Sequence, residues 1–254
     1  MKKIDRTGEV SYNNFGSKIK ITNYRNYDDI DVHFEEYNYT KEHTSYSQFT
    51  KGTIACPYEC RTYGVGYTGE GKYNVSINGE RTKCYIVWKD MIRRCYGNKK
   101  YYDKFPSYKD KIVCQSWHNF QVFAEWFEKN FYQIEGEVMA LDKDILCKGN
   151  KIYSPDTCIF VPQRINLLFI KRELYRGELP LGVDFDNRNC KFRVTYRVDK
   201  VKKHLGYYDT KEEAFEVYKN FKEKYIKKIA EEYKDKIPQK LYDAMIKYEI
   251  EIDD

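Results

Sequence analysis

One stretch, residues 141–166, restricts the fold of this chain more than any other. Residues 138–146 are largely apolar and predict a strand, Lys148-Gly149-Asn150 is typical of a turn, and residues 157–161 alternate as a second short strand. Pro162 then suits the first position of a helix. Two short strands and a short helix cannot bury a core of their own, so other parts of the chain must cover this unit.

The same stretch resembles the ββα-metal core of the HNH nucleases, in the variant found with phage-type homing endonucleases. In that family an Asp-His pair on the first strand supplies a metal ligand and a general base, and an Asn or His on the helix completes the metal site. The resemblance therefore implies that Asp142 and Asn166 hold one divalent ion, Mg²⁺ or Mn²⁺. This chain departs from the family at two positions, because Lys143 stands at the base position and Thr157 where an Asn is usual.

The lysine at the base position leaves more than one interpretation open. A lysine is protonated at neutral pH and accepts no proton from water unless it is strongly desolvated. Asp144 could instead take up a proton from a metal-bound water, so Asp142, Lys143 and Asp144 are the candidate catalytic residues. The alternatives are a catalytically dead core that is kept for binding, and a solvated strand end with no site.

Composition permits a folded protein that binds nucleic acid. The 254 residues are 41% hydrophobic and 17% aromatic, which favours a well-filled core, and the formal charge of +6 permits a DNA partner without requiring one. No apolar run reaches transmembrane length, and the N-terminus lacks the apolar segment of a signal peptide. We therefore expect no membrane partner and a cytoplasmic location (the host cytoplasm if the gene is a phage gene), where the eight cysteines stay reduced.

The N-terminal part predicts a small β module. Residues 18–22 and 30–34 alternate between polar and apolar side chains, as half-buried strands do. Residues 64–72 match a G-x-G-x-x-G pattern and nearly match a phosphate-binding loop, but Tyr73 stands where that loop needs Ser or Thr. We therefore favour a flexible glycine linker or hairpin, followed by a turn at Asn78-Gly79.

Two pairs of metal-binding residue types need an interpretation. Cys56 with Cys60, and Cys114 with His118, would supply four zinc ligands. The C-x₃-C spacing is unusual for zinc, and the two pairs lie far apart in the sequence, so we favour buried thiols and a packed imidazole over zinc. His118 is also a candidate substitute base, because it is the only histidine close in sequence to residues 141–166.

Two amphipathic helices are predicted before the ββα stretch. Apolar residues recur at helical spacing in residues 85–96, where Gly97 ends the helix, and in residues 117–131. This segment resembles the one that precedes the core in the same phage nuclease group. We expect these helices to supply the apolar faces that the ββα unit needs.

The C-terminal third predicts a separate module of three strands and a helix. Residues 191–197 alternate cleanly, a third strand follows, and Thr210 with Glu213 forms a capping box. The pattern L-G-Y-Y-D-T-x-E-E-A resembles the Apetala-type (ethylene-response-factor) DNA-binding domain, although the tryptophans of the plant domain are absent and Phe192 and His204 stand near those places. The expected DNA contacts are Lys191, Arg193, Thr195, Arg197, Lys202 and Lys203.

Together these patterns predict an α+β fold in three parts. Residues 1–72 form an N-terminal β module, residues 73–178 an HNH-like ββα core with supporting helices, and residues 179–254 an Apetala-type domain, a three-stranded antiparallel sheet with a packed helix. The predicted function is that of a phage-type endonuclease that binds and hydrolyses double-stranded DNA. The alternative, favoured by the missing base histidine, is a non-catalytic phage protein on a nuclease chassis: a DNA-binding regulator, or an inhibitor that binds a host anti-phage defence protein.

Overall fold

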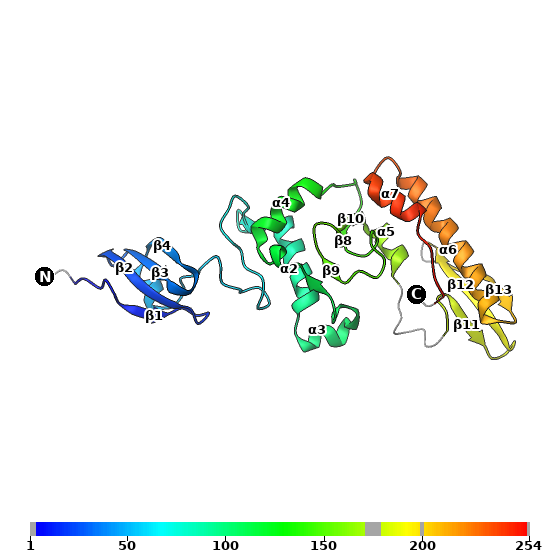
Figure 1. The fold of residues 1–254 in the computed structure, drawn as a ribbon, viewed down its shortest axis with the longest axis horizontal. Coiled ribbons are helices and arrows are strands. Elements are labelled where there is room, and N and C mark those ends of the chain that lie inside the picture. The colour runs from blue at the N-terminus through cyan, green and yellow to red at the C-terminus, as the bar shows by residue number, and fades with distance from the viewer. Residues whose placement is uncertain (1–3, 171–178, 199–200, 253–254) are drawn as a thin grey trace. The chain divides into compact units, whose positions relative to one another are not determined.

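The computed structural model describes residues 4–170, 179–198 and 201–252, and it has the mixed α+β composition that the sequence predicts (Figure 1). The chain divides into two compact units. The first comprises Met1–Lys129 with Lys151–Pro155, and the second comprises Asn130–Asn150 with Asp156–Asp254. The boundaries expected at residues 72 and 178 fall inside these units, and the packing described below explains why.

The first unit begins with a four-stranded antiparallel meander. Its strands are β1 (Val10–Tyr12), β2 (Lys18–Asn26), β3 (Asp29–Phe34) and β4 (Tyr39–Thr44), hydrogen-bonded in the order β1-β2-β3-β4. The short helices η1 (Glu35–Tyr37) and α1 (Tyr46–Thr50) lie on either side of β4 in the chain. The core consists of the apolar members of the alternating strands with α1 and the segment after it: Ile19, Ile21, Ile30, Val32, Phe34, Phe49, Ile54 and Cys56.

A buried carboxylate fastens the segment after α1 to the turn between β1 and β2. Glu59 is 3% exposed. Its carboxylate accepts hydrogen bonds from the side chain of Asn13, from Ser17 Oγ at 2.6 Å and from the backbone N–H of Cys56 at 3.1 Å. Arg61 Nε lies 3.7 Å from the same carboxylate. Because its partners come from two separate segments, Glu59 holds the chain after α1 against the turn between β1 and β2.

The glycine-rich segment is packed against helices and is not a free linker. A Cβ at Gly66 would lie 2.9 Å from the ring of Trp88, and Cβ atoms at Gly69 and Gly71 would overlap Asn119 and Gln121. Gly66 is therefore required by its close approach to a buried ring, and Gly69 by its positive φ of 64° as well. The hairpin predicted after them is present as β5 (Ser76–Ile77) and β6 (Glu80–Arg81).

Two helices form the rest of the first unit's core. α2 (Lys83–Tyr96) begins at Thr82, whose side chain accepts a hydrogen bond from Tyr85 N, and ends at Gly97 as predicted. α4 (Phe120–Asn130) packs Phe120 against Tyr85 and Trp88. The shorter elements between and after them are α3 (Lys99–Lys104), η2 (Pro106–Tyr108), η3 (Gln115–His118) and the parallel pair β7 (Ile112–Val113) and β9 (Ile152–Tyr153).

The second unit contains the predicted strand–strand–helix arrangement. β8 (Met139–Asp142) pairs antiparallel with β10 (Ile159–Pro162), with Asp142 opposite Ile159, and α5 (Gln163–Asn166) and η4 (Leu167–Phe169) follow directly. Pro162 is the residue that caps α5 and is not its first residue. Within this unit the apolar cover comes from α6 (Lys211–Tyr233) and α7 (Gln239–Ile246), through residues such as Ile226, Ile229 and Leu241.

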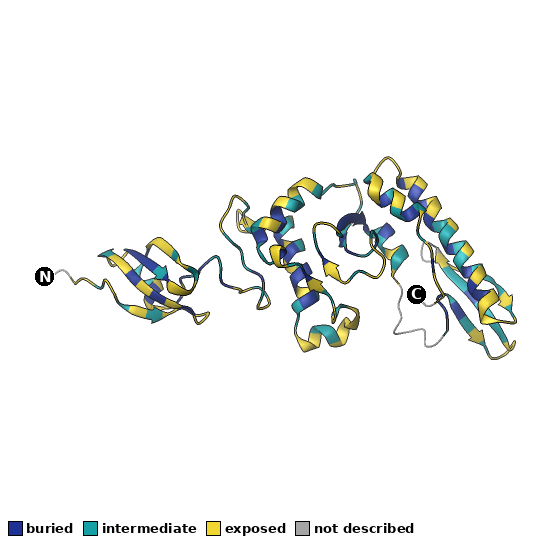
Figure 2. Cartoon of the chain, viewed as in Figure 1, coloured by how far each residue is buried: buried dark blue, intermediate teal, exposed yellow. Residues whose placement is uncertain are grey.

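The C-terminal sheet shares α6 with the ββα arrangement. Its strands β11 (Val183–Asp186), β12 (Lys191–Val198) and β13 (Val201–Tyr208) are antiparallel in sequence order. The first half of α6 packs on this sheet through Ala214, Phe215 and Tyr218, and its second half packs on β10 and α5 through Ile226 and Ile229. Figure 2 shows buried residues along one side of α6. Since α6 belongs to both apolar clusters, a boundary at residue 178 would place β8, β10 and α5 in one part and the helix that covers them in another.

Candidate functional site

Asp142 occupies the last position of β8, half-buried, where the chain turns away from β10. Its Oδ1 accepts hydrogen bonds from the backbone N–H groups of Asp144 and Ile145, both at 2.8 Å. Its Oδ2 accepts no hydrogen bond from the described residues. Burial, and after it the negative charge of Asp144, raise the pKa of Asp142 to about 6, although the two N–H groups and the charge of Lys143 act in the opposite direction.

Lys143 is buried, and its contacts are those of a structural residue. Its Nζ donates to Asp144 Oδ2 at 2.9 Å and to the backbone carbonyl of Asn150 at 3.0 Å. The side chain of Asn150 donates in return to the carbonyl of Lys143 at 2.7 Å. These bonds tie the two ends of the loop of residues 143–150 together. A general base needs a free lone pair aimed at a proton, and an amine that donates to a carboxylate does not offer one.

The two predicted metal ligands come from adjacent elements. Asn166 is the last residue of α5, is half-buried, and makes no side-chain hydrogen bond with the described residues. The carboxylate of Asp142 and the amide oxygen of Asn166 are hard oxygen donors, and Mg²⁺ is commonly held by one or two such groups with waters completing its shell. This donor chemistry fits Mg²⁺ or Mn²⁺. Asp144, with 44% of its side chain exposed, is the carboxylate nearest in the chain that is open to water.

A second acidic group, which sequence reasoning missed, lies in the N-terminal sheet. Ligand atoms of Asp29, Asp31 and His43 lie within 4.8 Å of one another. However, Arg25 donates to both oxygens of Asp31, at 2.9 and 2.6 Å, and also to Asp29 at 2.9 Å. This guanidinium lowers the pKa of Asp31 to about 2. Asp29, Asp31 and His43 therefore belong to an ion-pair network in which the guanidinium of Arg25 takes the place that a metal ion would occupy. The sequence pattern that could have indicated this group is Asp29-Ile30-Asp31 in one strand, followed by His43 in the next strand.

The four candidate zinc ligands are all described residues, and they do not come together. Among the described residues, the group of Asp29, Asp31 and His43 is the one set of three or more His, Cys, Asp or Glu side chains close enough to share an ion. Cys56 is buried and accepts a hydrogen bond from the N–H of Tyr58 at 3.4 Å. Cys114 Sγ lies 3.4 Å from Ser116 Oγ, and His118 Nε2 lies 3.3 Å from the hydroxyl of Tyr96. These three residues thus have local contacts that account for their positions, whereas Cys60 is exposed, so the expectation of buried thiols is correct for Cys56 and wrong for Cys60.

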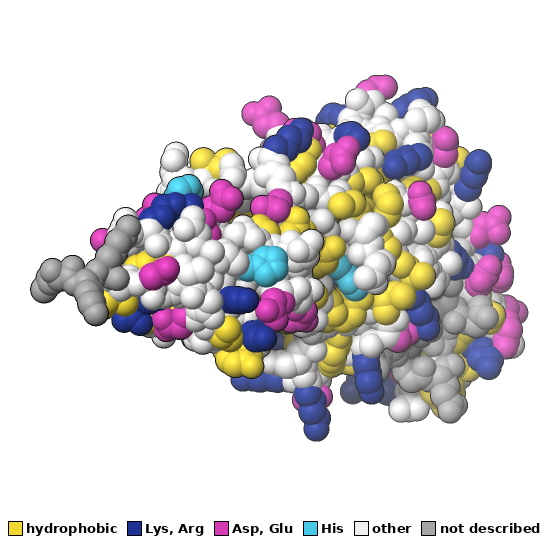
Figure 3. Space-filling view, turned by 60° about the vertical axis from the view of Figure 1, so that its left-hand side comes forward, with side chains coloured by type: hydrophobic (Ala, Val, Ile, Leu, Met, Phe, Trp, Pro, Cys, Tyr) yellow, Lys and Arg dark blue, Asp and Glu magenta, His cyan; other side chains and the backbone are white. Residues whose placement is uncertain are grey.

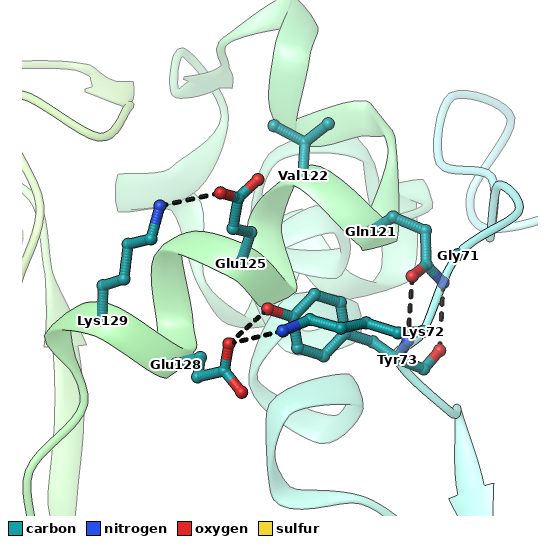
Figure 4. A pocket seen from close by; sticks show the side chains of 8 residues that line it. All are labelled: Gly71, Lys72, Tyr73, Gln121, Val122, Glu125, Glu128 and Lys129. Carbon is teal, nitrogen blue, oxygen red and sulfur yellow. Dashed lines mark hydrogen bonds and ion pairs between the residues drawn. The ribbon is translucent and has the colours of Figure 1, made fainter.

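The glycine segment borders a shallow pocket that carries no free phosphate-binding lysine (Figure 4). Lys72 Nζ and the hydroxyl of Tyr73 both reach Glu128, at 3.0 and 2.6 Å, and Lys129 pairs with Glu125 at 2.7 Å. Residue 73 enters the hairpin and no helix begins there. The charges of this pocket are matched within it, which supports the rejection of a phosphate loop.

The polar side chains of β12 face away from α6. Phe192, Val194 and Tyr196 belong to the core that α6 covers, so the alternate residues form the opposite surface. The strand register adds residues of β13 that pair with them. We call this surface the open face; it consists of Lys191, Arg193, Thr195 and Arg197 of β12 with Lys202, His204 and Tyr207 of β13. Lys203 pairs with Tyr196 and so lies on the side of the sheet that α6 covers.

Two cations of the open face are neutralised and two are not. Arg193 pairs with Asp184 at 2.7 Å, and Lys191 pairs with Asp209 at 3.1 Å. Arg197 and Lys202, which are opposite each other at one end of the sheet, form no ion pair with the described residues. The rings of His204 and Tyr207 lie 4.7 Å apart on the same face. Tyr207 was not predicted, because the bulge that places it there is not visible in the pattern.

In the part of the chain that the structure describes, no helix combines the length and the apolar character needed to cross a membrane. No family model, curated protein or solved structure matches the chain.

Proposed function

We propose that this chain binds double-stranded DNA through the open face of the C-terminal sheet. The observation that carries the proposal is that Arg197 and Lys202 are exposed, adjacent and without a carboxylate partner among the described residues. Two adjacent cations without carboxylate partners can contact phosphates. The side chains of Thr195, His204 and Tyr207 beside them can donate or accept hydrogen bonds at base edges. The resemblance to an Apetala-type domain supports the same face.

The binding would depend strongly on salt. Figure 3 shows Lys and Arg side chains mixed with Asp and Glu on the side of the molecule that it draws. On the open face itself, Asp209 and Asp184 neutralise Lys191 and Arg193, so two of its described cations remain for phosphates. Affinity would then rest on a few local phosphate contacts, each of which releases condensed counterions. Arg193 reaches DNA in this proposal only by exchanging its bond to Asp184, and we assign it to a positioning role.

The test uses the full chain and a duplex of about 25 base pairs, a length that spans two helical turns. Arg197→Ala with Lys202→Ala should weaken binding about tenfold and reduce the slope of log affinity against log salt by about 2. The matched control is Lys224→Ala with Lys227→Ala, which removes the same charge from the exposed side of α6. Equal losses in the two variants would overturn the proposal.

A second candidate function is metal-dependent hydrolysis of the bound DNA at the ββα arrangement. It is favoured by Asp142, whose Oδ1 is held by two N–H groups while Oδ2 accepts none from the described residues. Asp142 and Asn166 would hold Mg²⁺ or Mn²⁺, which when bound polarises a phosphate oxygen and acidifies its water. Asp144 is the residue assigned to accept the proton, since Lys143 is engaged as a donor.

Plasmid nicking in the presence of Mg²⁺ or Mn²⁺ tests the second candidate. Cleavage by the native chain that Asp142→Ala abolishes would support it. DNA binding without cleavage would remove hydrolysis and leave a regulator. Absence of both activities, together with tight binding of a host defence protein, would replace the two proposals with the inhibitor alternative.

A further inference from the structure

A basic segment of the first unit is not used by either proposal. Between positions 93 and 109 the chain carries six Lys or Arg residues and one acidic residue, Asp103. The segment covers the end of α2, the six-residue helix α3 and the 3-10 turn η2. We call its exposed part the α3 surface; it consists of Lys99, Lys100, Lys104, Phe105 and Lys109.

The lysines of the α3 surface combine exposure, the lack of an ion pair and closeness in the sequence; Lys20, Lys41 and Lys51 of the same unit are also exposed and without an ion pair among the described residues, but they lie far apart in the sequence. Lys72 pairs with Glu128 and Lys129 with Glu125, at 3.0 and 2.7 Å. None of the four lysines of the α3 surface forms an ion pair with the described residues, and Lys104 makes only a contact to the ring of Phe105, at 5.3 Å. The positive charge of this surface is therefore not neutralised by the fold around it.

Aromatic packing holds the α3 surface in a fixed arrangement. The ring of Tyr101 lies 5.0 Å from that of Phe105 and is stacked at 6.4 Å on that of Tyr108. The hydroxyl of Tyr102 donates to the carbonyl of Cys95 at the end of α2, at 2.5 Å. Asn98 caps α3 through its side chain, which accepts from Tyr101 N at 3.0 Å. A helix of six residues has little stability of its own, and these contacts explain why it forms.

The partner that fits such a surface is a regular array of negative charge. We infer that the α3 surface is a second contact with double-stranded DNA, made to the phosphate backbone without reading base sequence. Lysines contact phosphates as point charges, and four of them on one anchored segment match a row of phosphates. An anionic membrane fits less well, because Phe105 is the single exposed large apolar side chain among residues 93–109, and one ring beside the lysines is not a broad apolar face to insert.

This inference rests on the proposal that the chain binds DNA, but it concerns different residues in a different unit. A contact in each unit means that the chain holds the duplex at two independent places. Two linked contacts raise affinity above that of either one when both can engage the same duplex. Removing either surface should therefore weaken binding without abolishing it.

The experiment compares two triple variants of the full chain. Lys99→Gln, Lys100→Gln and Lys104→Gln together remove three charges from the α3 surface, and Lys20→Gln, Lys41→Gln and Lys51→Gln remove three exposed charges elsewhere in the same unit. We expect the first triple to weaken duplex binding about tenfold and to lower the salt slope by about 2 to 3, and the control to change affinity less than about twofold. Unchanged circular dichroism and thermal unfolding show that both variants are folded.

The outcomes separate this inference from the proposed function. If the α3 triple behaves like its control while Arg197→Ala with Lys202→Ala weakens binding, the inference fails and the sheet proposal stands. If only the α3 triple weakens binding, the inference stands and the sheet proposal fails. Loss of binding to vesicles that contain phosphatidylserine, with duplex affinity unchanged, would overturn the inference in favour of a membrane contact.

Discussion

The two carboxylate sites of this chain, around Asp31 and around Asp142, differ in where the balancing charge comes from. In the N-terminal sheet Arg25 contacts both oxygens of Asp31, and the pKa of that carboxyl falls to about 2. At the end of β8 backbone N–H groups hold one oxygen of Asp142, and burial raises its pKa to about 6. A site that contains its own cation is closed to another, whereas one with excess negative charge can take a cation from solution.

The largest expected effect is on the first site. Arg25→Ala leaves Asp31, which is 8% exposed, without its cation, so the free energy of unfolding should fall, and by more than in any of the variants below. Circular dichroism in a urea titration measures the change. Lys18→Ala is the matched control, because its pair with Glu35 is about half exposed and should be worth less than about 0.5 kcal/mol. Equal effects would show that the Asp31 network is not structural.

At the second site, removal of the charge should raise the free energy of unfolding instead of lowering it. With a chelator present at pH 7, Asp142→Asn removes a poorly solvated charge while an Asn oxygen can still accept from the N–H groups of Asp144 and Ile145. We expect unfolding free energy to rise by about 1 to 2 kcal/mol. Added Mg²⁺ should then raise the melting temperature of the native chain and leave that of the variant unchanged. A destabilised variant would mean that the charge of Asp142 is needed by the fold.

The two sites should also differ in pH dependence. The raised pKa of Asp142 means that the folded state binds a proton more readily than the unfolded state between about pH 4 and 6. Its contribution makes the protein more stable as pH falls through that window, so the gain from Asp142→Asn should shrink from pH 7 to pH 4. The lowered pKa of Asp31 acts in reverse, and its stabilising contribution is lost as pH falls from about 4 to about 2. Urea titrations at pH 7, 5 and 4 measure the first window; a gain from Asp142→Asn that does not change with pH would contradict the assignment.

The smallest expected effect concerns Lys143. Lys143→Met keeps the buried stem and removes the donor to Asp144 and to the carbonyl of Asn150, so unfolding free energy should fall by about 1 kcal/mol or less. Any nicking activity should persist. Activity that disappears in a variant of unchanged stability would show that Lys143 takes part in the chemistry.

Local patterns predicted the elements better than the way they pack. Alternation in residues 18–22 and 30–34 predicted two strands, and the turn at Asn78-Gly79 predicted a hairpin; all three are present. The helices of residues 85–131 were expected to cover the ββα arrangement; Phe131, at the end of that range, packs its ring on Phe160 of β10 at 5.1 Å, but the larger apolar cluster of this unit contains α6 and α7, which were not expected there. Periodicity shows that a helix has an apolar face and does not show which partner that face meets.

The open face shows the same limit at the scale of single residues. Lys202 and Lys203 were both predicted to contact DNA, yet neighbours in a strand point to opposite sides of a sheet. The pairing of Val198 with Val201 places Lys202 opposite Arg197 and Lys203 opposite Tyr196, and the register shift between Val194 and Thr195 then places Tyr207 opposite Arg193. A bulge changes the phase of the alternation and leaves no clear mark in the sequence.

Sequence alone determined that this chain has strands before residue 45 and again between residues 183 and 208, with a strand–strand–helix arrangement between them. It did not determine that the first of those middle strands, predicted over residues 138–146, ends at Asp142. The elements themselves are properties of neighbouring residues, which propensity and periodicity report directly. Tertiary structure decided which charges are neutralised: Lys72 pairs with Glu128, and Arg164 pairs with Glu232, whereas Arg197 and the lysines of the α3 surface pair with no carboxylate of the described residues. Electrostatic pairing depends on distance through space, and residues far apart in the chain become neighbours only when the sheets and helices pack.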